Sequence, residues 1–214
     1  MSFDIENTDK KYSINILDSI GIHNEYACLI AFAVGLELGL HPAEITSYLN
    51  KFTVPIGRMR IIAGVKDSII IDDSYNSSPL SLFGAMEVLS QINSYGKKIA
   101  ILGDMLELGK YSSEEHKKIA GILKGNVSLV FCVGLRMRRM ADELTHLGFK
   151  KSHIFCFDSS QEAGKELQKI IENGDTVLVK GSQSVRMEKI VESVMLHPEE
   201  KNQLLVRQEP EWLT

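Results

Sequence analysis

Acidic, hydroxyl and amide side chains follow one strongly apolar stretch of the sequence without interruption. Residues 69–71 are all isoleucine, and residues 72–76 read Asp-Asp-Ser-Tyr-Asn. A β-branched run with no polar alternation is typical of a buried parallel strand, because helices cover both of its faces. Ligands of open α/β sheets bind in the crevice outside the carboxyl ends of such strands. The sequence therefore predicts a ligand site that begins with Asp72 and Asp73.

Two later apolar stretches end in residues of the same chemical kind. Gly-Asp-Met-Leu-Glu follows the strand expected at 98–102, and Lys-Gly-Ser follows the strand expected at 176–179. Because parallel strand ends meet at one edge of a sheet, we expect these residues to converge. The residues that would meet there are Asp72, Asp73, Asp104, Glu107, Lys180 and Ser182. Several carboxylates with one lysine suit a phosphate or a metal-bound phosphate, with Lys180 as the counter-charge.

Each of these residues also has an explanation without function. A carboxylate after a strand often caps the next helix, although Ser77 or Ser78 could cap the helix here. For Asp72, capping or solvation explains the residue as well as ligand binding does. A lysine at a strand end, taken alone, is common on protein surfaces. A ligand site is favoured because polar residues of this kind follow three different strands. His116, on an expected helix, is interpreted as a solvated residue rather than a base.

The elements that must position these residues alternate along most of the chain. After a linker with Pro55 and Gly57, the first two strands are expected to form a hairpin that turns at 64–67. Strands are expected at 59–63, 68–71, 98–102, 128–133, 153–157 and 176–179, and helices at 80–92, 113–123, 136–147, 160–172 and 184–195. Such alternation predicts an α/β fold, with a Rossmann-like, mostly parallel sheet and helices on both faces. Residues 204–214 show little pattern.

The first 55 residues follow a different pattern. Residues 1–18 are polar, with one short strand expected at 13–17. Apolar residues at helical spacing predict helices at 23–38 and from 42 to about 51, separated by Gly39. Two short helices form a hairpin that is too small to be a domain alone. We therefore divide the chain into residues 1–55, a small helical part, and residues 56–214, the Rossmann-like part.

The composition is that of an ordinary soluble globular protein, with 44% hydrophobic and 24% charged residues. A net charge of −4 gives no basic field that would favour nucleic acid or an anionic membrane. No signal peptide or membrane-spanning stretch occurs, so we expect a cytoplasmic protein. Cys28, Cys132 and Cys156 lack metal-binding spacing, and the last two lie in apolar stretches, so we expect buried, reduced thiols.

A set of short motifs occurs in a fixed order along the chain. Gly-Ile-His-Asn begins at residue 21, Gly-Arg at 57, Ile-Asp-Asp-Ser-Tyr-Asn at 71, Leu-Gly-Asp-Met-Leu-Glu-Leu-Gly at 102, Val-Lys-Gly-Ser at 179 and Met-Glu at 187. Together they resemble the C-terminal half of the Mur ligases over roughly residues 21–194. Within that family, the motifs are most similar to those of the members that add D-alanyl-D-alanine to a UDP-N-acetylmuramoyl tripeptide.

The resemblance implies an ATP-dependent ligase of peptidoglycan precursor synthesis. In this family, ATP phosphorylates a substrate carboxylate, and an amine attacks the acyl phosphate to form an amide. The resemblance gives ATP and Mg²⁺ as cofactors, with the magnesium ligands mainly in the central domain. It implies nucleotide contacts for Arg58 (phosphates), Asp73 (ribose), His23 and Asn24 (near the adenine), Tyr75 and Asn76. It implies dipeptide contacts for Asp104, Glu107, Lys180, which would pair with the dipeptide carboxylate, and Ser182.

The chain also departs from the family pattern. No Gly-x-x-x-x-Gly-Lys-Ser/Thr occurs, so the loop that cradles ATP phosphates is missing. The UDP-sugar-binding domain and most of the central domain have no counterpart. The family usually has an adenine-contacting Asn where this chain has Ala27, and Ser77-Ser78 replaces Ala-Asn. Residues 1–55 resemble the trailing part of the central domain and residues 56–214 the third domain, so we expect the isolated chain to be inactive.

Two alternatives remain open at this point. The first is a non-catalytic subunit or binding module that pairs with a separate P-loop chain. The second, more remote, is a phosphoacceptor receiver domain, which also places paired aspartates, a lone aspartate and a lysine at strand ends. In a receiver the lone aspartate ends a strand two positions after the pair, whereas Asp104 ends the very next one.

Overall fold

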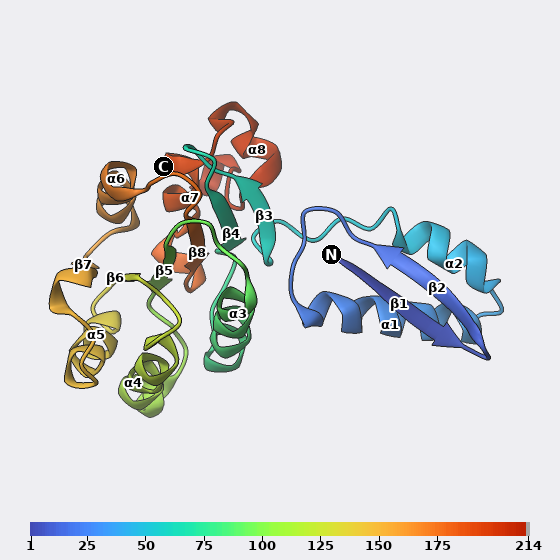
Figure 1. Ribbon diagram of the computed structural model, residues 1–214, viewed down its shortest axis with the longest axis horizontal. Coiled ribbons are helices and arrows are strands. Elements are labelled where there is room, and N and C mark those ends of the chain that lie inside the picture. The colour runs from blue at the N-terminus through green and yellow to red at the C-terminus, as the bar shows by residue number, and fades with distance from the viewer. Residues whose placement is uncertain (213–214) are drawn as a thin grey trace. The chain divides into compact units, whose positions relative to one another are not determined.

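The computed structural model describes residues 1–212. The chain divides into two compact units, Met1–Pro55 and Ile56–Thr214, both drawn in Figure 1. Each unit has its own hydrophobic core. Among the described residues, no helix combines the length and the apolar character that crossing a bilayer requires.

The first unit is a β-hairpin packed on two helices (Figure 1). Its elements are β1 (Ser2–Asn7), β2 (Lys10–Asn15), α1 (Ile22–Glu37) and α2 (Pro42–Leu49). The two strands pair antiparallel, and their inward residues pack on the helices around Ile14, Phe32 and Ile45. The two helices were predicted, whereas the hairpin was predicted only as one strand at 13–17.

The strand that sequence reasoning missed is β1. Phe3 and Ile5 alternate with polar neighbours, which is the pattern of a half-exposed strand. The turn to β2 carries Thr8 and Asp9, both with positive φ (43° and 63°), where hairpin turns favour Asn-Gly. The usual turn signal is absent, so the polar stretch gave no clear indication of a hairpin.

The second unit is a six-stranded sheet in the order β3-β4-β8-β5-β6-β7. The strands are β3 (Arg60–Ala63), β4 (Ile69–Asp73), β5 (Lys98–Gly103), β6 (Leu129–Val133), β7 (Ile154–Phe157) and β8 (Thr176–Lys180). β3 pairs with β4 antiparallel, and the other neighbours pair parallel. β4 and β5 are consecutive in sequence, yet β8 lies between them. This arrangement confirms the predicted mostly parallel sheet.

Helices cover both faces of this sheet, as predicted (Figure 1). They are α3 (Pro79–Gln91), α4 (Ser112–Leu123), α5 (Met137–His146), α6 (Ser160–Ile170), α7 (Glu188–Val194) and α8 (Lys201–Leu204). α6 and α7 pack on one face, where Ile101, Phe131 and Val179 form part of the core. α3, α4 and α5 pack side by side on the other face.

The structure differs from the prediction near the C-terminus. The helix expected at 184–195 begins only at Glu188, because Arg186 adopts a left-handed conformation (φ 59°) that interrupts the helix. Of the segment 204–214, expected to show little pattern, residues 213–214 lie outside the described residues, and the part before them packs on the sheet unit. Leu205 joins the core, and Arg207 is buried.

Candidate functional site

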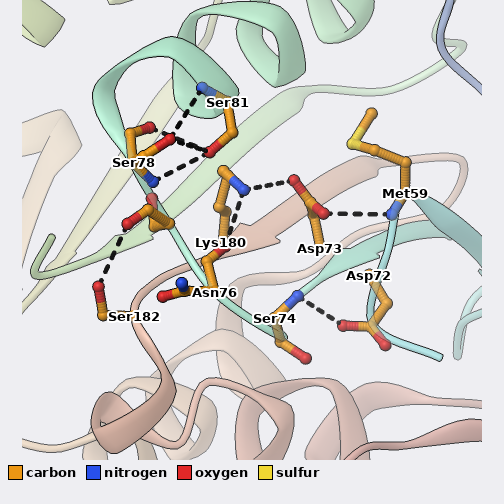
Figure 2. Close-up of polar contacts among 10 residues, drawn as sticks. Met59, Asp72, Asp73, Ser74, Asn76, Ser78, Ser81, Lys180 and Ser182 are labelled. Carbon is orange, nitrogen blue, oxygen red and sulfur yellow. Dashed lines mark hydrogen bonds and ion pairs between the residues drawn. The ribbon is translucent and has the colours of Figure 1, made fainter. Parts of the chain in front are cut away.

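The site is organised around an ion pair between the ends of two neighbouring strands. In the β4–β8 register, Asp73 lies directly beside Lys180, although 107 residues separate them in sequence. Register partners on neighbouring strands share a face. The Lys180 Nζ lies 2.6 Å from Asp73 Oδ2 and also donates to the Asn76 carbonyl at 2.9 Å (Figure 2). Asp73 Oδ1 accepts the Met59 N–H at 3.3 Å.

The Asp73–Lys180 pair is removed from solvent, which distinguishes it from a surface ion pair. The side chains of Lys180 and Asp73 are 1% and 8% exposed. Burial lowers the pKa of Lys180, and the charge of Arg58 lowers it further, whereas the ion pair with Asp73 opposes both effects. The resemblance implied that Asp73 contacts the ribose and that Lys180 contacts the dipeptide. In the structure, the two residues bind each other.

Asp72 faces the opposite side of the sheet, because successive strand residues alternate. Its Oδ1 accepts the Ser74 N–H at 3.1 Å (Figure 2), and its Oδ2 has no hydrogen-bond partner among the described residues. Burial raises the pKa of Asp72 to about 6. Ser78 caps α3 through its hydroxyl, so the helix-cap explanation considered for Asp72 is wrong.

Ser182, which follows β8, forms hydrogen bonds with the residues that follow β4 and β5. Its hydroxyl accepts the Leu106 N–H at 2.9 Å and donates to the Ser77 carbonyl at 3.4 Å. Its own N–H donates to the Asp104 carbonyl at 3.0 Å. The loops after β4, β5 and β8 are therefore tied together at one edge of the sheet, as the strand-end argument expected.

The two acidic residues after β5 have different environments. The Asp104 carboxylate accepts the Met137 N–H at 2.8 Å and lies 3.4 Å from an Arg136 nitrogen, so it binds the first turn of α5. The Asp104 side chain therefore caps the start of α5. Glu107 is exposed, with φ 62°, and no hydrogen bond to its side chain occurs among the described residues. Of the two residues, Glu107 is the one available to a ligand.

Arg58 and Tyr75 form the exposed part of the same edge. The Arg58 guanidinium lies over the Tyr75 ring, 4.2 Å from its centroid, and both side chains reach solvent. The Tyr75 N–H donates to the Gly57 carbonyl at 3.1 Å, and a Cβ on Gly57 would lie 3.0 Å from that nitrogen. Gly57 (φ 71°) therefore allows the linker to approach the loop closely. Asn76 is exposed, and its carbonyl holds Lys180.

Two residues that support this edge were not recognised in the sequence. His116 is fully buried: Nε2 accepts the Met105 N–H at 3.0 Å, and Nδ1 lies 2.6 Å from the Ser112 carbonyl. The interpretation of His116 as a solvated residue is wrong. Its spacing from Ile119 and Leu123 on one helix face was the available signal.

Arg207 is the second residue, and it comes from the segment without pattern. Its guanidinium donates to the carbonyls of Ser74 and Tyr75 and pairs with Glu188 at 3.0 Å. The side chains of Arg207 and Glu188 are 4% and 1% exposed. No periodicity surrounds Arg207, so nothing in the sequence could indicate this contact.

His23 and Asn24 lie at the start of α1 in the first unit. Asn24 is buried and donates to the Ser19 hydroxyl at 2.8 Å and to the Ile20 carbonyl at 3.3 Å. These two hydrogen bonds fix the segment before α1, and both are donated by the side-chain nitrogen of Asn24. His23 is exposed and its ring lies against Gly21. Among residues 1–212, no group of His, Cys, Asp or Glu side chains is arranged to hold a metal ion.

Comparison with known proteins decides the family. The model of the family described as "Mur ligase, glutamate ligase domain" matches residues 57–183. This chain belongs to the Mur ligase family. The matched residues contain all three strand ends of the Mur ligase chain's candidate site and Arg58, which supports the resemblance seen in its motifs.

Several similar proteins are ligases of one kind. The UDP-N-acetylmuramoyl-tripeptide–D-alanyl-D-alanine ligase of Bacillus subtilis is 29% identical over 198 residues, which are 92% of this chain and 42% of the relative. The ligase of the same name from Buchnera aphidicola subsp. Baizongia pistaciae is 33% identical over 183 residues, 84% of this chain and 38% of the relative. The Mur ligase chain thus spans about two fifths of the length of these curated relatives.

Solved structures show the same fold. The MurF ligase from Thermotoga maritima in complex with ADP superposes with a TM-score of 0.74 at 24% identity, covering 90% of this chain and 42% of that one. A MurF from Acinetobacter baumannii gives 0.75 at 24% identity, covering 89% and 41%. Because the chain belongs to the Mur ligase family, the alternative hypothesis of a phosphoacceptor receiver domain is set aside.

Proposed function

We propose that this chain is the C-terminal part of an ATP-dependent ligase that adds D-alanyl-D-alanine to a UDP-N-acetylmuramoyl tripeptide. The proposal rests on one structural observation above all. Asp73, Lys180 and Ser182 come from strands far apart in sequence and meet at one carboxyl edge of the sheet. Relatives that carry this name in several bacteria support the choice of substrates.

The proposed reaction needs two ligands at this edge. ATP transfers its terminal phosphate to the tripeptide carboxylate, and the dipeptide amine then displaces phosphate from the acyl phosphate to form the amide. Mg²⁺ would neutralise the phosphate charges, and we assign its ligands mainly to the part of the ligase beyond this chain. Arg58 is exposed and lies over the Tyr75 ring, so its guanidinium fork can bind phosphate oxygens.

The Asp73–Lys180 pair has a part in this proposal. A buried charge without a partner is strongly unfavourable, so two opposite charges at a ligand site pair with each other when ligands are absent. We propose that ligand binding exchanges these partners. Asp73 would accept hydrogen bonds from ribose hydroxyls, and Lys180 would bind the dipeptide carboxylate. Asp104 and Ser182 would shape the dipeptide side through the loop they hold, and exposed Glu107 would contact the dipeptide directly.

An exposed apolar surface in the first unit supports the proposal that further polypeptide takes part in the ligase. α1 buries one face, yet apolar residues on its other faces are exposed: Ile22, Tyr26, Leu29, Ile30, Val34 and Leu38. A helix that is apolar all round is normally buried on all sides. The sequence has no P-loop. We propose that a P-loop polypeptide, joined to this chain or separate, covers α1, and that His23 and Asn24 then lie near the adenine.

The test is reconstitution. This chain is mixed with the part of the Bacillus subtilis ligase outside its matched 198 residues, and phosphate release is followed with ATP, Mg²⁺, UDP-N-acetylmuramoyl tripeptide and D-alanyl-D-alanine. The proposal expects release that depends on D-alanyl-D-alanine and is lost in Arg58→Ala. Ile30→Asp should prevent assembly, whereas Lys11→Asp, on the exposed edge of the hairpin, should not. Turnover by the isolated chain would overturn the proposal.

A further inference from the structure

Two cysteines lie directly beside each other on the outer strands of the sheet. Cys132 on β6 and Cys156 on β7 are register partners. Neighbouring strands lie about 4.8 Å apart, and register partners of parallel strands point to the same face. Disulfides join residues whose Cα atoms are about 4.4–6.8 Å apart. The backbone therefore already provides the separation that a Cys132–Cys156 disulfide requires.

The two thiols are in contact but have different environments. Cys132 is fully buried, whereas Cys156 is exposed on β7, the edge strand. Their interaction is the largest cause of the lowered pKa of Cys156, about 7, and of the raised pKa of Cys132. The lowered pKa belongs to the exposed thiol, and the raised pKa belongs to the buried one.

Charged side chains surround the exposed thiol. On α5, Arg138 lowers the pKa of Cys156 and Asp142 raises it. Arg138 also pairs with Asp158 at 2.7 Å, which holds the guanidinium near the end of β7. On the buried side, Asp104 contributes to the raised pKa of Cys132. A cation beside an accessible thiol is the environment in which cysteines react with electrophiles.

A purely structural explanation accounts for part of this arrangement. Buried cysteines often fill space as small apolar side chains, and Cys132 fits that description. Exposed Cys156 does not, and the expectation that it is buried is wrong. Cys28 is buried on helix α1 of the first unit, outside any strand pairing, and burial raises its pKa. The chain therefore contains an internal comparison for thiol reactivity.

We propose that Cys132 and Cys156 form a reversible redox pair that hydrogen peroxide converts to a disulfide. The Cys156 thiolate attacks one peroxide oxygen: an S–O bond forms, the O–O bond breaks, and the departing oxygen leaves as water after taking up a proton. The Cys132 sulfur then attacks the sulfenic acid. The S–S bond forms, the S–O bond breaks, and the hydroxyl leaves as water with the Cys132 proton. The thiols lose two electrons, and the peroxide gains them. Small thiols reverse the change by exchange.

This pair lies apart from the Asp73–Lys180 ion pair, although the charge of Asp104 reaches Cys132. Asp73 and Lys180 lie on β4 and β8, whereas the cysteines lie on the two strands at the far side of the sheet order. The inference therefore does not depend on the proposed ligase activity. A failure of reconstitution would leave it untouched, and its own failure would leave the ligase proposal untouched.

The test uses the whole chain and hydrogen peroxide. The chain is treated at neutral pH, free thiols are blocked with N-ethylmaleimide, and tryptic peptides are identified by mass spectrometry. We expect a linked peptide pair containing Cys132 and Cys156 that dithiothreitol removes, in wild type and in the control Cys28→Ala. In Cys132→Ala, dimedone should label Cys156 as the sulfenic acid. In Cys156→Ser, Cys132 should stay reduced.

Three results would overturn the inference. These are the absence of a linked pair under conditions that alkylate Cys156, linkage to Cys28 instead, and equal peroxide reactivity of Cys28 and Cys156. If Cys132→Ala fails to fold, as judged by circular dichroism, the linked peptide in wild type and in Cys28→Ala decides the matter alone. Labelling of Cys156 about ten-fold faster than Cys28 is the expected kinetic difference.

Discussion

Replacing Lys180 with Met should destabilise the sheet unit strongly. The Met side chain has a similar length and no charge, so Asp73 would stay buried with the Met59 N–H as its remaining donor. Breaking a buried ion pair by removing one partner typically costs about 3–5 kcal/mol, because an uncompensated charge stays inside. We expect Lys180→Met to lower the free energy of unfolding by about 3–5 kcal/mol.

The structure also predicts the outcome of removing both charges. Burial is the largest influence on the pKa of Lys180 and outweighs the attraction of Asp73, so desolvation is a large term for this pair. The double variant Asp73→Asn/Lys180→Met should therefore recover most of the loss and end within about 1–2 kcal/mol of wild type. The two single losses would then be far from additive, as expected for residues in contact.

Urea unfolding followed by circular dichroism measures these differences. A matched control is the surface pair Lys169–Glu166, whose 2.7 Å separation is similar but whose side chains are 69% and 30% exposed. Lys169→Met should change stability by less than about 1 kcal/mol. If Lys180→Met has no larger effect than Lys169→Met, or if the two single losses simply add, the reasoning about a buried pair is refuted.

Other supporting side chains give further predictions. Since burial raises the pKa of Asp72 to about 6, the folded chain holds this proton more tightly than the unfolded chain, and stability falls as pH rises through that value. Asp72→Asn should change little near about pH 4 and stabilise by about 3 kcal/mol above about pH 7, as read from urea unfolding across pH; a pH-independent effect would contradict this. His116→Phe should destabilise by about 1–3 kcal/mol in the same assay, because the buried Met105 N–H loses its acceptor; an unchanged midpoint would contradict it. Arg207→Met should destabilise by about 3 kcal/mol and speed amide hydrogen exchange at residues 74–76, and unchanged exchange would contradict the contact.

The elements of the sheet could be predicted because their signals are local. Ile69, Ile70 and Ile71 form a run that is typical of a buried strand, and the alternation of strands with helices determines the fold class. The convergence of strand ends follows from parallel pairing alone. The pairing of Asp73 with Lys180 could not be predicted, because it depends on β8 lying between β4 and β5.

Other parts of the candidate site had no local signal at all. Arg207 lies in a segment without periodicity, and its contacts with Ser74 and Tyr75 depend on tertiary structure. The same is true of Cys132 and Cys156, whose sequence spacing says nothing about their register. Asp104 shows the opposite error, since a strand-end carboxylate that was expected to face a ligand binds the start of α5 instead.

The most direct test of the central claim is amide formation by a chimera. This chain replaces the matched 198 residues of the Bacillus subtilis ligase, and the product from ATP, UDP-N-acetylmuramoyl tripeptide and D-alanyl-D-alanine is measured by mass spectrometry. We expect the chimera to form the amide, the isolated chain to form none, and Arg58→Ala to abolish the product while the chimera stays folded. A folded chimera that makes no product, or an isolated chain that makes it alone, would contradict the account.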